Sequence, residues 1–211
     1  MNTPIYNLRP RRQGSIPDVI FVLLVANGLV FALQNFQFSQ VFIYKFFALW
    51  PLGSHRADFY PWQLLTYGFL HGGGMHILFN MFMLWMFGRE LAVMMGDKRF
   101  LIYYLTGVVG AGIVQLIVAS VQGGDYPTVG ASGGVFALLL AFGMTFPNRM
   151  IILMFPPIPM KAKYMVILFG FLELYMGASG SAPGVANFAH LGGMLFGFML
   201  LYYWRNLGRR G

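Results

Sequence analysis

The stretch that decides the fold is VGASGGVFALLLAF, residues 129–142. It begins with small residues and one hydroxyl, Ser132, and continues as an apolar run without polar alternation. A membrane strand alternates apolar and polar residues, whereas a helix surrounded by hydrocarbon is apolar throughout. The stretch therefore predicts an apolar helix with a potential nucleophile in its first turn.

The composition of the whole chain supports this interpretation. Hydrophobic residues make up 58% of the 211 positions, charged residues make up 9%, and the mean hydropathy is +0.65. Because lipid cannot satisfy backbone N–H and C=O groups, we expect an all-α, polytopic membrane protein. Six runs are long enough to span, or nearly span, a hydrocarbon core about 30 Å thick. They are residues 19–37, 75–95, 100–121, 130–147, 162–179 and 185–204.

The basic residues predict the orientation of these six helices. If the N-terminus is cytoplasmic, 12 of the 14 Lys and Arg residues fall on the cytoplasmic side, with Lys45 and Arg56 outside. We expect a basic cytoplasmic tail at 1–16, a six-helix domain at 17–211, cytoplasmic N- and C-termini, and a bacterial inner membrane as the location. The basic residues form no continuous stripe, so the net charge of +8 does not indicate a nucleic-acid partner.

The first outer loop, residues 38–74, carries the aromatic stretch VFIYKFFALWPL at 41–52. This stretch is too short to span a bilayer and is interrupted by Lys45, so it predicts a membrane-associated element at the interface. The alternative is an ordinary outer loop with an aromatic anchor.

Four polar side chains are predicted near the outer ends of three helices: Ser132, His190, His76 and Asn80. A serine hydroxyl is a poor nucleophile unless a base within hydrogen-bond reach accepts its proton, and neutral His190 suits that task. A side-chain amide such as Asn80 and a histidine N–H, together with the Ser132 backbone N–H, can stabilise an oxyanion. The chain has no cysteine, which excludes thiol chemistry and disulfides.

Small residues predict how the nucleophile and the base meet. Gly130 and Gly133 flank Ser132 and leave its backbone open to a neighbouring helix and to substrate. In the sixth predicted helix, small residues recur every four positions: Ala189, Gly193 and Gly197. Such a stripe permits close helix contact.

Three motifs carry a family resemblance: GASG at 130–133, HGGGMHILFN at 71–80 and AHLGG at 189–193. The sequence resembles the rhomboid intramembrane serine proteases in their minimal six-helix form, and the similarity covers essentially the whole chain.

The resemblance implies an acyl-enzyme mechanism with Ser132 as nucleophile and His190 as general base, a dyad without an acid and without a cofactor or metal. It places His76 and Asn80 at oxyanion-stabilising positions and gives His71 a structural role in holding the first outer loop. The implied partners are the lipid bilayer and single-pass membrane proteins, which are cleaved near the outer face. Neither Asp125 nor Glu173 is expected to orient His190.

The chain departs from the family pattern at three places. Gln63 stands where relatives commonly have arginine, so we expect the first outer loop to dock through other contacts. Ala92 stands where a glutamate is frequent, with Glu90 two positions earlier, which leaves the inner packing of that helix open. Phe136 stands where tyrosine is frequent, and its ring is expected to stack on His190.

Two other classes of function remain open at this stage. One is a proteolytically inactive member that binds membrane clients, which the presence of both Ser132 and His190 disfavours. The other is a small transporter or metal permease that uses His71, His76, His190 and Glu173 as ligands. That reading leaves Ser132 without a task, and no paired discontinuous helices or inverted repeat are evident. The oligomeric state is undetermined.

Overall fold

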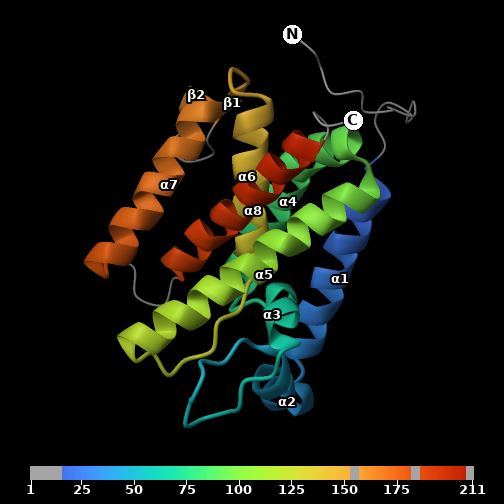
Figure 1. The fold of residues 1–211 in the computed structure, drawn as a ribbon. Coiled ribbons are helices and arrows are strands. Elements are labelled where there is room, and N and C mark those ends of the chain that lie inside the picture. The colour runs from blue at the N-terminus through green and yellow to red at the C-terminus, as the bar shows by residue number, and fades with distance from the viewer. Residues whose placement is uncertain (1–15, 153–156, 182–185, 208–211) are drawn as a thin grey trace.

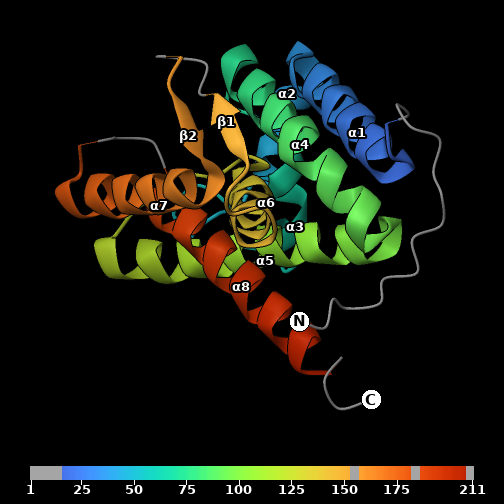
Figure 2. The same cartoon turned by 90° about the horizontal axis from the view of Figure 1, so that it is seen from above.

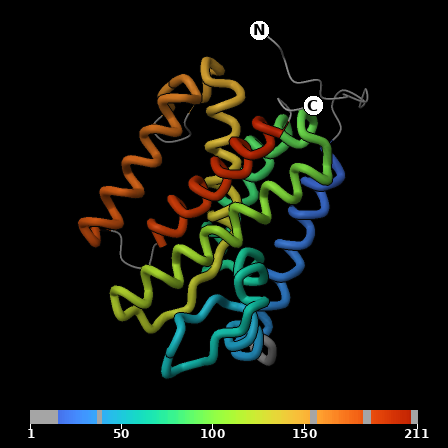
Figure 3. Tube along the Cα trace, viewed as in Figure 1, coloured from blue at the N-terminus to red at the C-terminus, as the bar shows by residue number. Residues whose placement is uncertain are grey.

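The computed structural model describes residues 16–152, 157–181 and 186–207. Within them, six helices have 14 or more residues: α1 (Asp18–Gln34), α4 (Gly74–Met95), α5 (Asp97–Gln122), α6 (Ser132–Thr145), α7 (Ala162–Ser179) and α8 (Asn187–Leu207). They follow the six predicted runs, and α1 begins at the same end of the bundle at which α8 ends (Figures 1 and 3). The prediction of a mainly helical protein is confirmed. The predicted tail, except Ile16, lies outside the described residues.

The helices leave much apolar surface facing outward. Two helices in the described part, α4 and α5, are long and apolar enough to cross a membrane, judged by length and composition alone. Only 33% and 44% of their apolar windows are buried inside the protein. The apolar helices α1 and α6 are shorter, at 17 and 14 residues. Exposed apolar area on this scale is typical of a surface that contacts lipid, and the number of spanning helices stays a prediction.

Helix α6 lies in the centre of the bundle. Figure 2 looks along it and shows α4, α5, α7 and α8 around it. Its contacts with α5 and α8 run through glycines that approach backbone to backbone. A Cβ at Gly133 would lie 2.3 Å from the Ala111 Cβ, and a Cβ at Gly193 would lie 2.1 Å from the Gly133 carbonyl oxygen. The predicted small-residue stripe of α8 is therefore its contact with α6.

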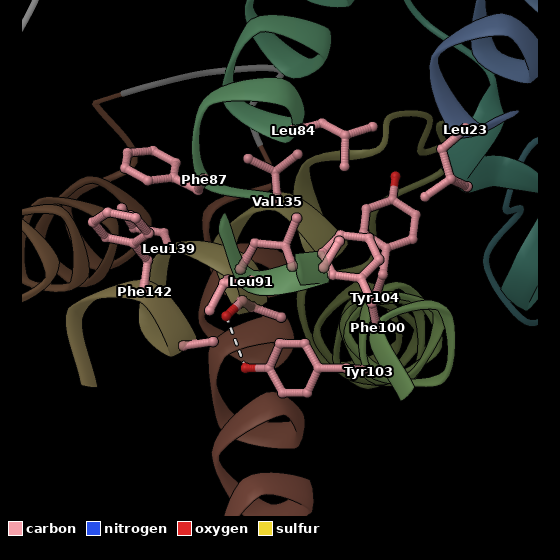
Figure 4. Packing of buried hydrophobic residues seen from close by; sticks show 14 of the residues in the cluster. Leu23, Leu84, Phe87, Leu91, Phe100, Tyr103, Tyr104, Val135, Leu139 and Phe142 are labelled. Atoms are coloured by element: carbon pink, nitrogen blue, oxygen red, sulfur yellow. Dashed lines mark hydrogen bonds between the residues drawn. The ribbon is translucent and has the colours of Figure 1, made fainter. Parts of the chain in front are cut away.

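The hydrophobic core lies between α4, α5 and α6. Figure 4 shows side chains of α4 (Leu84, Phe87, Leu91), α5 (Phe100, Tyr103, Tyr104) and α6 (Val135, Leu139, Phe142) packed together. The Tyr103 hydroxyl donates a 2.8 Å hydrogen bond to the Ala137 carbonyl, drawn as the dashed line. This bond satisfies a buried polar group and fixes α5 against α6.

The inner half of α4, which the sequence left open, is well packed. Ala92 is fully buried in the core cluster. The Glu90 side chain is partly exposed and forms a 3.2 Å ion pair with Arg149, which follows α6 in the chain. A smaller residue at position 92 therefore fits a tight helix contact, while the acidic residue is paired at the surface.

The first outer loop contains three short helices: α2 (Gln37–Phe47), α3 (Gln63–Thr66) and the 3₁₀ helix η1 (Tyr67–Phe69).

The predicted first span, 19–37, was too long, because α1 ends at Gln34. The Asn35 side chain donates a 2.6 Å hydrogen bond to the Phe31 carbonyl, and Phe36 is extended. An asparagine that bonds its own backbone in this way competes with helix continuation.

Gln63 itself docks this loop, contrary to the expectation that other contacts would replace the family's arginine. Its side chain is fully buried, and its Oε1 accepts a 3.2 Å hydrogen bond from the Trp50 backbone N–H. The neighbouring Trp62 indole donates a 2.8 Å hydrogen bond to the Phe46 carbonyl. Two adjacent side chains thus fasten the α3 segment to the end of α2.

The connection after α6 contains a two-stranded antiparallel hairpin. Strand β1 (Met150–Ile152) pairs with β2 (Pro159–Lys161), with Ile151 opposite Met160. Figure 2 shows the strands on the side of α6 that lies between α4 and α7. Residues 153–156 at the tip lie outside the described part, as do residues 182–185 between α7 and α8.

Candidate active site

Ser132 is the first residue of α6, two positions later than the predicted start of the fourth helix. The preceding Gly130 has φ +135°, a conformation that side-chain-bearing residues rarely adopt, and its N–H donates a 3.0 Å hydrogen bond to the Tyr67 carbonyl. A bridge between Leu49 and Thr128 ties the same segment to the first outer loop. Ser132 is thus held at a helix N-terminus, where free backbone N–H groups favour negative charge.

His190 lies in α8 with its Nε2 at 2.8 Å from the Ser132 Oγ. The Phe136 ring, one turn after Ser132, stacks on the imidazole with ring centroids 4.4 Å apart and an interplanar angle of 5°. The imidazole is therefore fixed by the close approach of α8 to α6 and by a flat aromatic surface. The structure brings together the two side chains on which the sequence argument rests.

The other nitrogen of this imidazole faces an acid that the sequence analysis gave no role. The Glu173 Oε2, on α7, lies 3.0 Å from the His190 Nδ1 and accepts a 2.6 Å hydrogen bond from the Asn187 side-chain amide. The Nδ1 makes no directed hydrogen bond, so its contact with the carboxylate is electrostatic. Glu173, which was not expected to orient His190, is thus the acid that lies beside its imidazole. The sequence did contain a sign of such a role, because Glu173 is an ionisable residue inside an apolar helix.

His76 presents one ring nitrogen to the site. Its Nδ1 accepts a 3.2 Å hydrogen bond from the Gly72 backbone N–H, so the neutral ring carries its proton on Nε2. That edge of the ring faces Gly130, where an added Cβ would lie 2.8 Å from the His76 Nε2. The glycine therefore leaves room for an N–H donor beside Ser132.

Asn80 lies one turn further along α4 and is 6% exposed. Its side-chain nitrogen donates a 2.9 Å hydrogen bond to the His76 carbonyl, which fixes the amide and leaves its second hydrogen available. Asn80 and His76 thus occupy one face of α4, as their spacing of four residues predicted.

His71 lies just before α4 and is fully buried. The Gln34 side chain holds its backbone, since Oε1 accepts a 3.0 Å hydrogen bond from the His71 N–H and the amide donates to the His71 carbonyl. Its ring packs edge to face on His76, at 5.1 Å between centroids. Burial, with the nearby His76 as a second cause, lowers the pKa of His71 to about 4. The ring is therefore neutral at physiological pH.

These side chains converge on a cavity of about 700 Å³. Ser132, His190, His76 and Asn80 line it together with apolar residues, and the lining continues to Ile151 and Ile152 of the hairpin. An apolar cavity with a few converging polar groups is the usual form of a ligand site. In the described residues, no group of three His, Asp or Glu side chains is arranged to hold a metal ion.

Comparison with known proteins places the chain in a family. Residues 58–206 match the family model described as the Rhomboid domain. The chain belongs to the rhomboid family. That family consists of polytopic membrane proteins and includes intramembrane proteases, and the three motifs that surround the cavity lie within the matched residues.

Rhomboids from mitochondria and from a bacterium are similar to this one. The mitochondrial Rhomboid protein 1 of Saccharomyces cerevisiae is 28% identical over 197 residues, which cover 89% of this chain and 53% of that protein. The mitochondrial presenilin-associated rhomboid-like protein of Mus musculus is 28% identical over 223 residues, 95% of this chain and 57% of the relative. The rhomboid protease GluP of Bacillus subtilis is 32% identical over 138 residues, 65% of this chain and 25% of the relative. The chain thus spans about half the length of the mitochondrial relatives.

Proposed function

We propose that this rhomboid is an intramembrane serine endopeptidase that cleaves single-pass membrane proteins near the outer face of the membrane. The observation that carries the proposal is the 2.8 Å contact between the Ser132 Oγ and the His190 Nε2 at the edge of the cavity. A hydroxyl within hydrogen-bond reach of an imidazole is the arrangement that nucleophilic catalysis needs.

In the first step, the Ser132 oxygen attacks the carbonyl carbon of the scissile peptide bond and its proton passes to the His190 Nε2. The carbonyl oxygen takes the electron pair of the C=O π bond and becomes an oxyanion. We assign the stabilisation of this oxyanion to the Ser132 backbone N–H, the His76 Nε2–H and the Asn80 amide, because all three residues line the cavity. A single donor of this kind typically contributes about 2.7–4 kcal/mol to transition-state stabilisation.

When the intermediate collapses, the C–N bond breaks and the His190 Nε2–H gives its proton to the leaving amine, which leaves an acyl ester on Ser132. Water then attacks the acyl carbon of this ester and transfers a proton to the His190 Nε2. The bond between that carbon and the Ser132 Oγ breaks, Oγ takes the proton back from His190, and the carboxylic acid is released. The protein's own side chains perform all of these proton transfers, so the reaction needs no cofactor.

The shape of the cavity supports a transmembrane substrate. Its walls are largely apolar and come mainly from α4, α6, α7 and α8, with Ile151 and Ile152 of the hairpin also in the lining. A substrate helix has to unwind locally to present its carbonyl to Ser132, because its backbone groups are otherwise hydrogen-bonded within the helix. Substrates with small residues and weak helices at the cleavage site are therefore favoured. We place both termini in the cytoplasm, as the distribution of basic residues indicates. The location that we propose is a bacterial inner membrane.

The test is cleavage of a fluorogenic transmembrane substrate by protein reconstituted into liposomes. Ser132→Ala and His190→Ala are expected to abolish cleavage, which should continue in the presence of a metal chelator. Two variants of the same residue types serve as controls: Ser120→Ala, whose hydroxyl bonds the carbonyl one turn before it in α5, and His55→Ala in the outer loop. Cleavage that survives both site substitutions, or that stops with the chelator, would contradict the proposal.

A further inference from the structure

The strongest feature that the dyad leaves unexplained is a buried carboxylate on α7. The Glu173 side chain is 8% exposed and the His190 side chain is 12% exposed. Removing a carboxylate from water costs several kcal/mol, so such a group is retained only where partners compensate for the loss. Here the partners are the His190 imidazole at 3.0 Å and the Asn187 amide at 2.6 Å, and both contact the same oxygen, Oε2.

The face of α7 that carries this acid is fitted to α8. Gly170, Glu173 and Gly177 are spaced at three and four residues and so lie on one side of the helix. A Cβ at Gly177 would lie 3.0 Å from the Phe188 ring and 3.2 Å from the Asn187 Cβ, and one at Gly170 would lie 3.8 Å from the Met194 methyl. The small residues bring α7 close enough for the carboxylate to reach the imidazole.

We propose that Glu173 is a positioning residue for His190, which makes the site a serine–histidine–glutamate arrangement built from α6, α8 and α7. This inference rests on the proposed protease function. A carboxylate beside Nδ1 favours the ring tautomer with its proton on that nitrogen, which leaves Nε2 free to accept the Ser132 proton. When that proton arrives, the imidazolium has a counter-charge 3.0 Å away. Because the acid is on α7, any separation of α7 from α8 removes this support.

Two ionisable side chains face His190 in the described residues: Glu173 from α7 and His76 from α4. Helix α6 presents Ser132 and the Phe136 ring. Comparing Glu173→Gln with the wild type leaves His76 unchanged, so the difference between their pH–rate profiles reports the carboxylate alone. Glutamine keeps the length of the side chain and can still accept the Asn187 hydrogen bond. It therefore preserves the link between the helices and removes the charge.

The experiment measures kcat and KM for the transmembrane substrate as functions of pH in three variants. Glu173→Gln is expected to lower kcat by about 10²-fold with little change in KM, because orienting acids of this kind act mainly on the chemical step. The acid limb of its profile should move to lower pH, because the imidazolium has lost its counter-charge. Glu173→Asp should recover part of the rate. Glu90→Gln neutralises an acid that pairs with Arg149 far from the site, and it should match the wild type.

A measurement on the wild type makes the test independent of activity and of the folding of any variant. Nitrogen-15 NMR of labelled histidine should show His190 protonated on Nδ1 and unprotonated on Nε2 at neutral pH. Protonation on Nε2 alone, or a folded Glu173→Gln with wild-type kcat and pH profile, would overturn the role of Glu173. Failure of the protease proposal looks different, because cleavage would then survive Ser132→Ala whatever occupies position 173.

Discussion

The contact between α8 and α6 sets the distance between the His190 imidazole and the Ser132 hydroxyl, so one added methyl group there should strongly reduce the proposed cleavage activity. In Gly193→Ala, the new Cβ would lie 2.1 Å from the Gly133 carbonyl oxygen and 2.8 Å from its carbonyl carbon. The shortest carbon–oxygen contacts in proteins are about 3.3 Å. To lengthen the contact of the new Cβ to that distance, α6 and α8 have to separate locally by about 1.2 Å.

The consequence for the site follows from the position of His190, which lies one turn before Gly193 in α8. A shift of that size lengthens the 2.8 Å contact between Nε2 and Oγ to about 4 Å, beyond hydrogen-bond range. A misplacement of about 1 Å lowers enzymatic rates by about 10²-fold, so we expect a loss of kcat on this scale. The overpacking should also lower the free energy of unfolding by about 1–3 kcal/mol.

The assay is steady-state cleavage of the fluorogenic substrate in liposomes, with thermal denaturation measured on the same preparations. Gly28→Ala is the matched control, because a Cβ at that position of α1 meets nothing within 4 Å. It should retain wild-type kcat. A folded Gly193→Ala with wild-type kcat would refute the argument that this glycine contact sets the catalytic distance.

Three further predictions concern stability, measured as the free energy of unfolding in mixed micelles. Burial lowers the pKa of His71 from 6.5 to about 4, so protons bind preferentially to the unfolded chain, and stability should fall by about 3 kcal/mol as the pH drops from 6.5 to 4. In His71→Leu, this decline in the free energy of unfolding should be absent. If the decline is unchanged in that variant, other titratable groups cause it. Gln63→Leu should cost about 1–3 kcal/mol at neutral pH, because it leaves the buried Trp50 N–H without a partner; wild-type stability would show that another group replaces Gln63. Glu90→Gln should change stability by less than about 1 kcal/mol, because its pairing with Arg149 is solvent-exposed; a larger loss would show that this pair is structural.

The sequence predicted the long helices because hydrocarbon surroundings impose a simple pattern: uninterrupted apolar runs with charges at their ends. The prediction of the elements from the sequence was wrong where local interactions act against that pattern. Asn35 lies inside an apolar run yet ends α1 by bonding the Phe31 carbonyl. The hairpin at 150–161 was missed because three-residue strands flanked by prolines have no clear periodicity.

In the candidate site, too, the sequence indicated some of the residues and not others. Ser132, His76 and His190 could be singled out from the sequence because each is a polar residue near the outer end of a predicted apolar helix and lies in a motif that resembles the rhomboid family. Glu173 and Asn187 could not be joined in the same way. Their contact depends on the rotation of α7 about its axis, which a chain of mostly apolar residues does not reveal. Gln63 was interpreted as a lost arginine, although a buried amide can accept from Trp50 and hold the loop without a charge.

The central claim is that the hydroxyl of Ser132 is activated by His190, and covalent labelling tests it most directly. The reconstituted protein is treated with a fluorophosphonate, and the modified residue is identified by mass spectrometry. We predict one adduct on Ser132 that is strongly reduced in His190→Ala and unchanged in His55→Ala. An adduct on another residue, or full labelling of Ser132 without the imidazole, would contradict the claim.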